Sequence, residues 1–185
     1  MGRYINKGNI AFRDIVSREY VDKSSLIPLI NGTLNSENRY SCVTRCRRFG
    51  KSMAAKMLCA YYDKSCGSRE LFSGLAAEKD KSFEAYLNKY YVISIDMTDF
   101  TTKYRNDKDI VKKIQDRVIK DIQDVFSQIS VEDDDDLMDV LYSISASTGE
   151  RFFMIIDEWD AMKISNSGMT DIKSAMRNPS TTHTP

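Results

Sequence analysis

The sequence contains one histidine and no Cys-x-x-Cys pair, so it lacks the usual ligands of a zinc site. The histidine is His183, and the cysteines are Cys42, Cys46, Cys59 and Cys66. Protein zinc sites draw mainly on closely spaced cysteine and histidine side chains. The cysteine spacing does not suggest a disulfide framework either. Four free thiols favour a reducing compartment, and we therefore expect a cytoplasmic location.

The sequence also lacks a long hydrophobic run and an excess of charge of either sign. Its longest apolar run has six residues, 57–62, which is far too short to cross a bilayer. Residues 1–10 are polar, so we expect no signal peptide and no membrane partner. Lysine plus arginine and aspartate plus glutamate number 27 each, so the bulk charge favours neither nucleic acid nor a membrane surface.

The composition does provide enough apolar material for one soluble domain of ordinary size. Of the 185 residues, 42% are hydrophobic and 29% are charged. We expect the domain to span residues 1–164, with residues 1–40 as a lead-in. Residues 165–185 are expected to add a short helix and a polar, disordered tail.

The most informative stretch lies between a β-prone run at 41–44 and a helix-prone run at 53–62. A strand, a tight loop, Gly-Lys-Ser and a helix together predict a row of backbone N–H groups around a polyphosphate. Gly50 lets the backbone approach phosphate, Lys51 supplies a cation for the outer phosphates, and Ser52 offers a hydroxyl to Mg²⁺. The complete motif has a glycine where Arg45 stands. Alone, therefore, the segment is equally compatible with a basic, solvated turn.

The middle of the chain predicts one strand and two amphipathic helices. Residues 90–96 are rich in β-branched and aromatic side chains and predict a strand, with 97–100 as the loop leaving it. Apolar residues at helical spacing from Ile110 to Ile129 predict a long helix. The acidic run 132–136 is interpreted as the solvated start of a further helix, ended by Gly149, rather than as a metal site.

A second functional segment begins with five consecutive apolar residues, 152–156, and continues with Asp157 and Glu158. Such a run predicts a strand buried on both faces, as in a parallel sheet covered by helices. Ligands bind at the carboxyl ends of strands in these sheets. Asp157 is therefore predicted to help hold Mg²⁺, and Glu158 to polarise a water. Alone this is an ordinary strand with a polar exit, but it complements Gly50-Lys51-Ser52.

Three motifs in this order make the sequence resemble the AAA-ATPase-like family of bacterial and archaeal proteins. They are Tyr20-Val21-Asp22-Lys23-Ser24, Arg45-Cys46-Arg47-Arg48-Phe49-Gly50-Lys51-Ser52 and Asp157-Glu158-Trp159-Asp160. The resemblance covers about residues 9–163 and implies ATP as the nucleotide. The family pattern itself has arginine at position 45. This sequence departs from that pattern at Cys46 (proline), Ser24 (threonine) and Trp159 (tyrosine).

The resemblance also implies an unfinished molecule, because family members continue well beyond this point and many carry a restriction-nuclease-like domain. We therefore expect a sheet that is incomplete at its C-terminal side, and either self-association or a missing C-terminal region. Weak ATPase activity is expected from this chain alone.

Together these patterns predict an α/β fold of the P-loop NTPase type, with a largely parallel sheet and helices on both faces. The expected function is Mg²⁺-dependent ATP binding, with hydrolysis as a further activity to be tested. Glu158 and Lys51 are the predicted catalytic residues, and Ser52 and Asp157 the predicted metal ligands. The predicted nucleotide-binding residues are Arg45, Cys46, Arg47, Arg48, Phe49, Gly50, Lys51, Ser52 and Met53.

A different class of function stays open at this point, namely a non-hydrolysing module that binds phosphate or nucleic acid. Arg45, Arg47, Arg48 and Lys51 form a dense basic loop, and such loops also bind phosphate backbones. DNA binding with a steep salt dependence that survives Glu158→Gln would favour this alternative.

Overall fold

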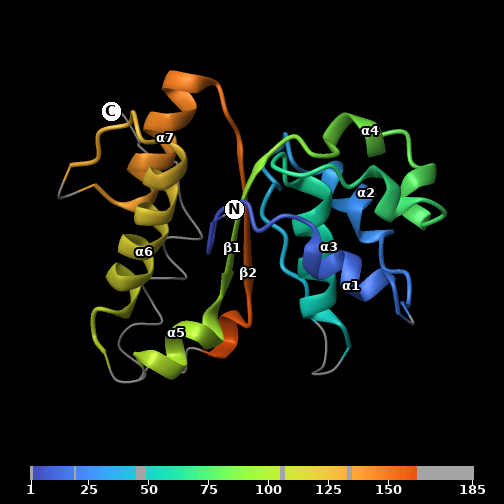
Figure 1. The fold of residues 1–185 in the computed structure, drawn as a ribbon, viewed down its shortest axis with the longest axis horizontal. Helices are drawn as coiled ribbons and strands as arrows, with labels where there is room; N and C mark the ends of the chain where they lie inside the picture. The colour runs from blue at the N-terminus through green and yellow to red at the C-terminus, as the bar shows by residue number, and fades with distance from the viewer. Residues whose placement is uncertain (1, 19, 45–48, 105–106, 133–134, 162–185) are drawn as a thin grey trace, which may run out of the picture.

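The computed structural model describes residues 2–18, 20–44, 49–104, 107–132 and 135–161. A parallel pair of strands, β1 (Tyr91–Asp96) and β2 (Phe152–Asp157), stands between two layers of helices (Figure 1). The pairing runs from Tyr91 beside Phe152 to Asp96 beside Asp157. Backbone hydrogen bonds from Asn6 N to Val92 O and from Ser94 N to Tyr4 O, both 2.8 Å, occupy the other edge of β1. The predicted α/β class, with a parallel sheet covered on both faces, is confirmed at this level.

One helical layer is built around α3 (Lys51–Tyr62), whose last six residues are buried. The aromatic ring of Tyr62 stacks on that of Phe153 in β2, with ring centroids 4.0 Å apart. Residues 57–62, the longest apolar run of the sequence, thus form the centre of this core. The rest of the layer comprises α1 (Ile10–Val16), α2 (Leu26–Asn31), α4 (Phe83–Tyr86) and the 3₁₀ turns η1 (Arg69–Phe72) and η2 (Ala76–Lys79).

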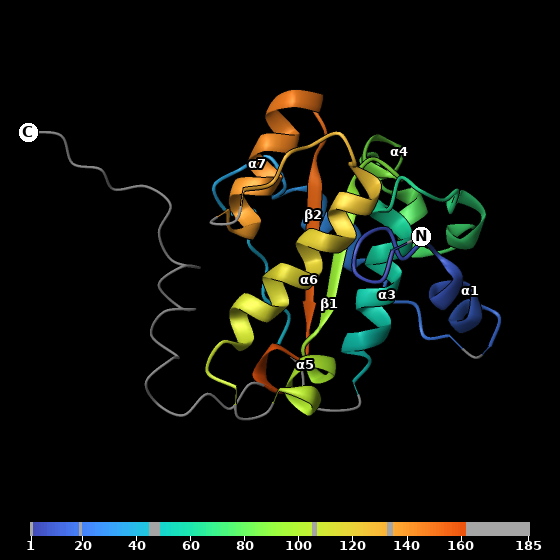
Figure 2. The same cartoon turned by 60° about the vertical axis from the view of Figure 1, so that its left-hand side comes forward.

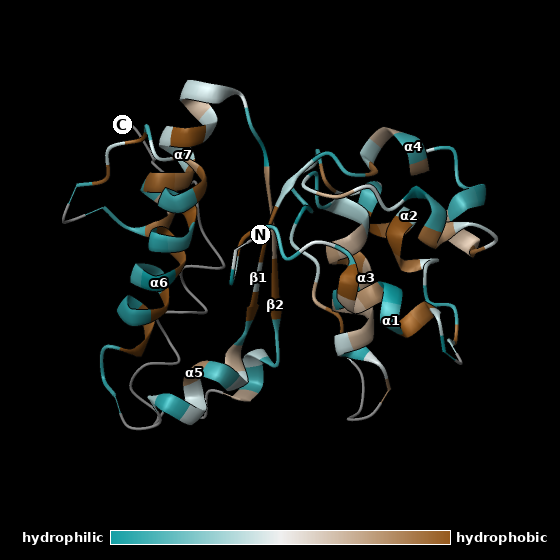
Figure 3. Cartoon of the chain, in the orientation of Figure 1, coloured by the Kyte–Doolittle hydropathy of each residue, from teal (hydrophilic) through white to brown (hydrophobic). Residues whose placement is uncertain are grey.

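The opposite layer contains α5 (Met97–Lys103), α6 (Ile110–Val125) and α7 (Leu137–Thr148), as Figure 2 shows. The apolar stripe of α6 faces the sheet and its polar side faces outward (Figure 3). Asp136 and Asp139 form a capping box at the start of α7, and Gly149 ends that helix at φ 72°. The predicted helix start at the acidic run is confirmed for these described residues.

Three sequence-based predictions were wrong in detail. Residues 41–44 are exposed and form no strand, since no described strand lies beside them to supply a ladder. In β2 only Ile155 is buried, and Met154 and Ile156 keep 39% and 37% of their surface exposed. The reason is that β1 is the only described strand paired with β2. Residues 97–100 begin α5 rather than a loop.

The predicted helix and tail in 165–185 lie outside the described residues. Within the described part of the chain, no helix is long and apolar enough to cross a membrane.

Candidate functional site

Gly50 is the N-cap of α3 and has a left-handed backbone, with φ 78° and ψ 27°. Only glycine adopts this conformation without steric cost, so the sequence sets the turn that starts the helix. Because Gly50 has no side chain, no N-cap group occupies the amide N–H groups of the first turn. Lys51 and Ser52 are the first two residues of the helix, and both are half-buried. A helix start of this kind suits a bound phosphate.

The carboxyl ends of the two strands bring Asp96 and Asp157 side by side in register. Side chains alternate between the two faces of a strand, so these aspartates share a face with Val92 and Ile155. Both of those residues belong to the core around α3. The two carboxylates therefore project from the face of the sheet that α3 covers.

The first turn of α3 and the carboxyl ends of β1 and β2 lie at the same end of the molecule (Figures 1 and 2). Helix α3 contacts both strands. The structure thus places both predicted segments at the same end of the molecule.

Asp96 received no role from the sequence motifs, although both predicted strands end in aspartate and that coincidence was a usable signal. Its Oδ1 accepts hydrogen bonds from Thr98 N at 2.9 Å and Thr98 Oγ1 at 2.6 Å, which caps α5. Because the cap uses Oδ1 for both bonds, the carboxylate keeps Oδ2 as a second acceptor at the edge of the sheet.

Glu158 follows β2 with a left-handed backbone, at φ 50°. A non-glycine residue in this region is uncommon, and such strained residues cluster at functional sites. Its N–H donates to Asp157 Oδ1 at 3.0 Å, and its carbonyl accepts from Ala161 N at 2.9 Å in the turn η3 (Trp159–Ala161). These bonds hold the chain in the turn that carries the Glu158 carboxylate past the sheet.

The remaining predicted residues are only partly described. Phe49 is 63% exposed and Met53 is half-buried, so neither is part of the apolar core. Arg45, Cys46, Arg47 and Arg48 lie outside the described residues, so Lys51 is the one described residue of the basic loop on which the nucleic-acid alternative depends.

The described residues include no group of three or more histidine, cysteine, aspartate or glutamate side chains suited to a metal ion. At this end of the molecule the described residues offer two carboxylates, Asp96 and Asp157, at the strand ends, and the hydroxyl of Ser52 in the first turn of α3. A small oxygen-rich set of this kind fits Mg²⁺, which takes one or two carboxylates and completes its shell with water and substrate phosphates.

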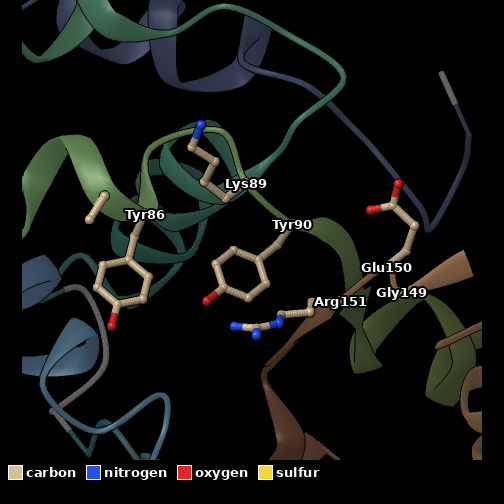
Figure 4. Close-up of a pocket in the computed structure, with 7 residues that line it drawn as sticks. Tyr86, Lys89, Tyr90, Gly149, Glu150 and Arg151 are labelled. Carbon is tan, nitrogen blue, oxygen red and sulfur yellow. The ribbon is translucent and has the colours of Figure 1, made fainter. Parts of the chain in front are cut away.

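A surface pocket of about 280 Å³, drawn in Figure 4, lies where the two strands begin. It adjoins the starts of β1 and β2 and is lined by Ala85, Tyr86, Lys89, Tyr90, Gly149, Glu150 and Arg151. Burial raises the pKa of Tyr90, while its hydrogen bond with Arg151 lowers it. Ligands of parallel sheets bind at the carboxyl ends of the strands, so this pocket is separate from the candidate site.

Comparison with protein families shows to which family the chain belongs. Residues 8–183 match the family model AAA-ATPase-like, which is described as a predicted AAA-ATPase. The chain belongs to the AAA-ATPase-like family. The match extends past residue 163, where the recognised motifs end, and this membership indicates a nucleotide-binding protein. Neither the curated proteins nor the solved structures yielded a match to this AAA-ATPase-like chain.

Proposed function

We propose that this AAA-ATPase-like chain binds ATP with Mg²⁺ at the carboxyl edge of β1 and β2 and hydrolyses it there. The observation that carries the proposal is that Gly50-Lys51-Ser52 starts α3 at the end of the molecule where Asp157 and Glu158 leave β2. A phosphate-binding helix start and an acidic strand end are the two halves of a nucleotide site. The family match supports a nucleotide as the ligand.

Each residue of the site has a role that its chemistry suits. Gly50 lets the loop close around phosphate, and the amides of the first turn of α3 donate to phosphate oxygens. Lys51 supplies positive charge to the outer phosphates, and Ser52 and Asp157 would hold the metal ion. Mg²⁺, when bound, would supply positive charge that offsets the charge of the phosphates.

Glu158 is the proposed general base. Its carboxylate accepts a proton from the water that attacks the γ-phosphorus, while the bond from that phosphorus to the bridging oxygen of ADP breaks. The half-buried, turn-constrained setting of Glu158 limits the orientations of the carboxylate, and orientation is a large part of catalysis in phosphoryl transfer.

Titration calorimetry with ATP and Mg²⁺ tests the binding proposal, using the parent chain and Lys51→Ala. Removing the ammonium group should weaken ATP binding by about 10- to 100-fold, since hydrogen bonds to charged groups contribute roughly 1.5–3 kcal/mol. The matched control is Lys56→Ala, which removes an exposed lysine from the same helix and should leave affinity unchanged. Equal ATP affinity in Lys51→Ala and the parent would overturn the assignment of this loop.

A further inference from the structure

The side chain of Lys23 lies across Gly50, although the two residues are 27 positions apart in the chain. A Cβ atom built on Gly50 would come within 2.9 Å of Lys23 Cε and 3.7 Å of Lys23 Nζ. The half-buried Lys23 side chain therefore ends beside the residue that precedes Lys51. The motif at residues 20–24 has no role in the proposed site. This contact places that motif beside the candidate phosphate loop.

The residues on either side of Lys23 anchor its backbone to the turn η2. Asp22 Oδ1 accepts from Ser24 N at 2.7 Å, and Asp22 Oδ2 accepts from Ala76 N at 2.8 Å. The fully buried Ser24 accepts through Oγ from Ala77 N at 2.9 Å. Burial opposes ionisation of Asp22, but these amide donors lower its pKa below the usual value. The Asp22 charge thus interacts mainly with backbone amides.

Tyr20 anchors the same segment to α3. Its hydroxyl accepts from Lys23 N at 3.3 Å and donates to Met57 Sδ at 3.4 Å. Its ring packs edge-on against Phe12, with centroids 5.5 Å apart. Since Met57 belongs to the helix that Gly50 begins, the Lys23 backbone is fixed relative to the loop it covers.

Several positive groups at this point suit an anion. The N-terminus of α3 carries the positive end of the helix dipole, and Lys51 adds a full positive charge. The Lys23 ammonium adds another, and it takes part in none of the ion pairs among the described residues. A bound polyphosphate would interact favourably with these positive charges.

We propose that Lys23 is a second phosphate-binding lysine of this site, supplied by the lead-in segment rather than by the loop. Residues Tyr20, Asp22 and Ser24 fix the segment, and Lys23 directs its ammonium to phosphate oxygens next to Gly50. The proposal rests on the proposed nucleotide binding and adds a binding residue to it.

The test measures binding of ATP and of inorganic tripolyphosphate by calorimetry at several salt concentrations. Lys23→Met keeps the aliphatic packing over Gly50 and removes the charge, so affinity for both ligands should fall about 10- to 100-fold. The salt dependence of ATP affinity should become shallower, while the melting temperature stays within a few degrees of the parent. Lys23→Arg should retain most of the affinity, and the exposed control Lys81→Met should behave as the parent.

The possible failures are distinguishable. If Lys51→Ala loses ATP and Lys23→Met binds it like the parent with the same salt dependence, Lys23 is only a packing residue and this inference is wrong. A lowered melting temperature in Lys23→Met with an unchanged salt dependence leads to the same conclusion. If the parent chain binds neither ATP nor tripolyphosphate, the proposed function fails and this inference fails with it.

Discussion

At the scale of single residues, Glu158 combines a strained backbone with a carboxylate at the end of a parallel strand. A positive φ costs a non-glycine residue on the order of 1–3 kcal/mol, and the hydrogen bonds of Glu158 and Asp157 offset part of that cost. Glycine would adopt the conformation freely but would remove the carboxylate. Glutamate at this position agrees with the role proposed above for its carboxylate.

We expect Glu158→Gln to bind ATP as the parent does and to hydrolyse it about 10²–10⁴ times more slowly. The amide preserves size and shape but does not accept the proton of the attacking water. Phosphate release under single-turnover conditions measures the effect. Asp160→Asn, in the neighbouring turn, is the control and should hydrolyse ATP at the parent rate. Equal turnover by Glu158→Gln and the parent would assign Glu158 to the backbone turn alone.

Cys59 makes stability depend on pH in the alkaline range. Burial raises the pKa of its thiol from 9.0 to about 11, against smaller lowering effects of Ser94 and Lys7. In the unfolded chain the pKa of the thiol is near 9.0. Below that pH the thiol is neutral in both states, and its full contribution to the free energy of unfolding is present. The contribution is lost as the pH rises from about 9 to about 11. Urea midpoints should therefore fall more steeply over this window in the parent than in Cys59→Ala, and parallel curves would contradict the assignment.

At the scale of elements, a buried polar network joins α2, α3 and α4. Asn31 donates to Tyr61 Oη at 3.0 Å and to Ser82 Oγ at 2.9 Å, and it accepts from Tyr62 Oη at 2.7 Å. Tyr61 donates in turn to the carbonyl of Phe83 at 2.7 Å. All buried side-chain polar atoms in the described residues have a partner. The network therefore fixes how these short helices dock on α3.

Asn31→Ala should lower the free energy of unfolding by about 1–3 kcal/mol, because it leaves the buried Tyr62 hydroxyl without its acceptor. Asn35→Ala is the matched control, since Asn35 is exposed and makes one side-chain bond to Tyr86 Oη at 3.1 Å. That control should change stability by no more than about 0.5 kcal/mol. Urea unfolding of the three proteins measures both effects, and equal losses would show that the network is not stabilising.

The elements that the sequence predicts well are those with local signals. Helix α6 has a continuous apolar stripe, α7 has Asp136 and Gly149 at its ends, and β1 has a run of β-branched and aromatic residues. Residues 41–44 would form a strand only beside a partner strand. The local sequence pattern carries no information about whether such a partner is present. The exposure of Met154 and Ile156 has the same origin, because a run of apolar residues does not reveal which edges and faces are covered.

At the scale of the whole molecule, the sheet separates two cores. Val92 and Ile155 belong to the core around α3, whereas Ile93 and Ile95 belong to the core of α6 and α7. Gly50-Lys51-Ser52 and Asp157-Glu158 were predictable as a pair, since each carries a chemical signature. Lys23 was not, because its proposed role arises from a long-range contact, and Asp96 was overlooked although its strand, like β2, ends in aspartate.

The proposed nucleotide site lies where α3 begins and β1 and β2 end. Two-dimensional NMR of the ¹⁵N-labelled chain, titrated with ATP and Mg²⁺, tests this placement most directly, because each amide reports its own surroundings. We expect saturating shifts that are largest at Gly50, Lys51, Ser52, Asp157 and Glu158. Signals at Lys89 and Arg151, in the pocket at the other end of the sheet, should stay unchanged. Saturable shifts confined to that pocket, or no saturable shifts at all, would contradict the proposed site.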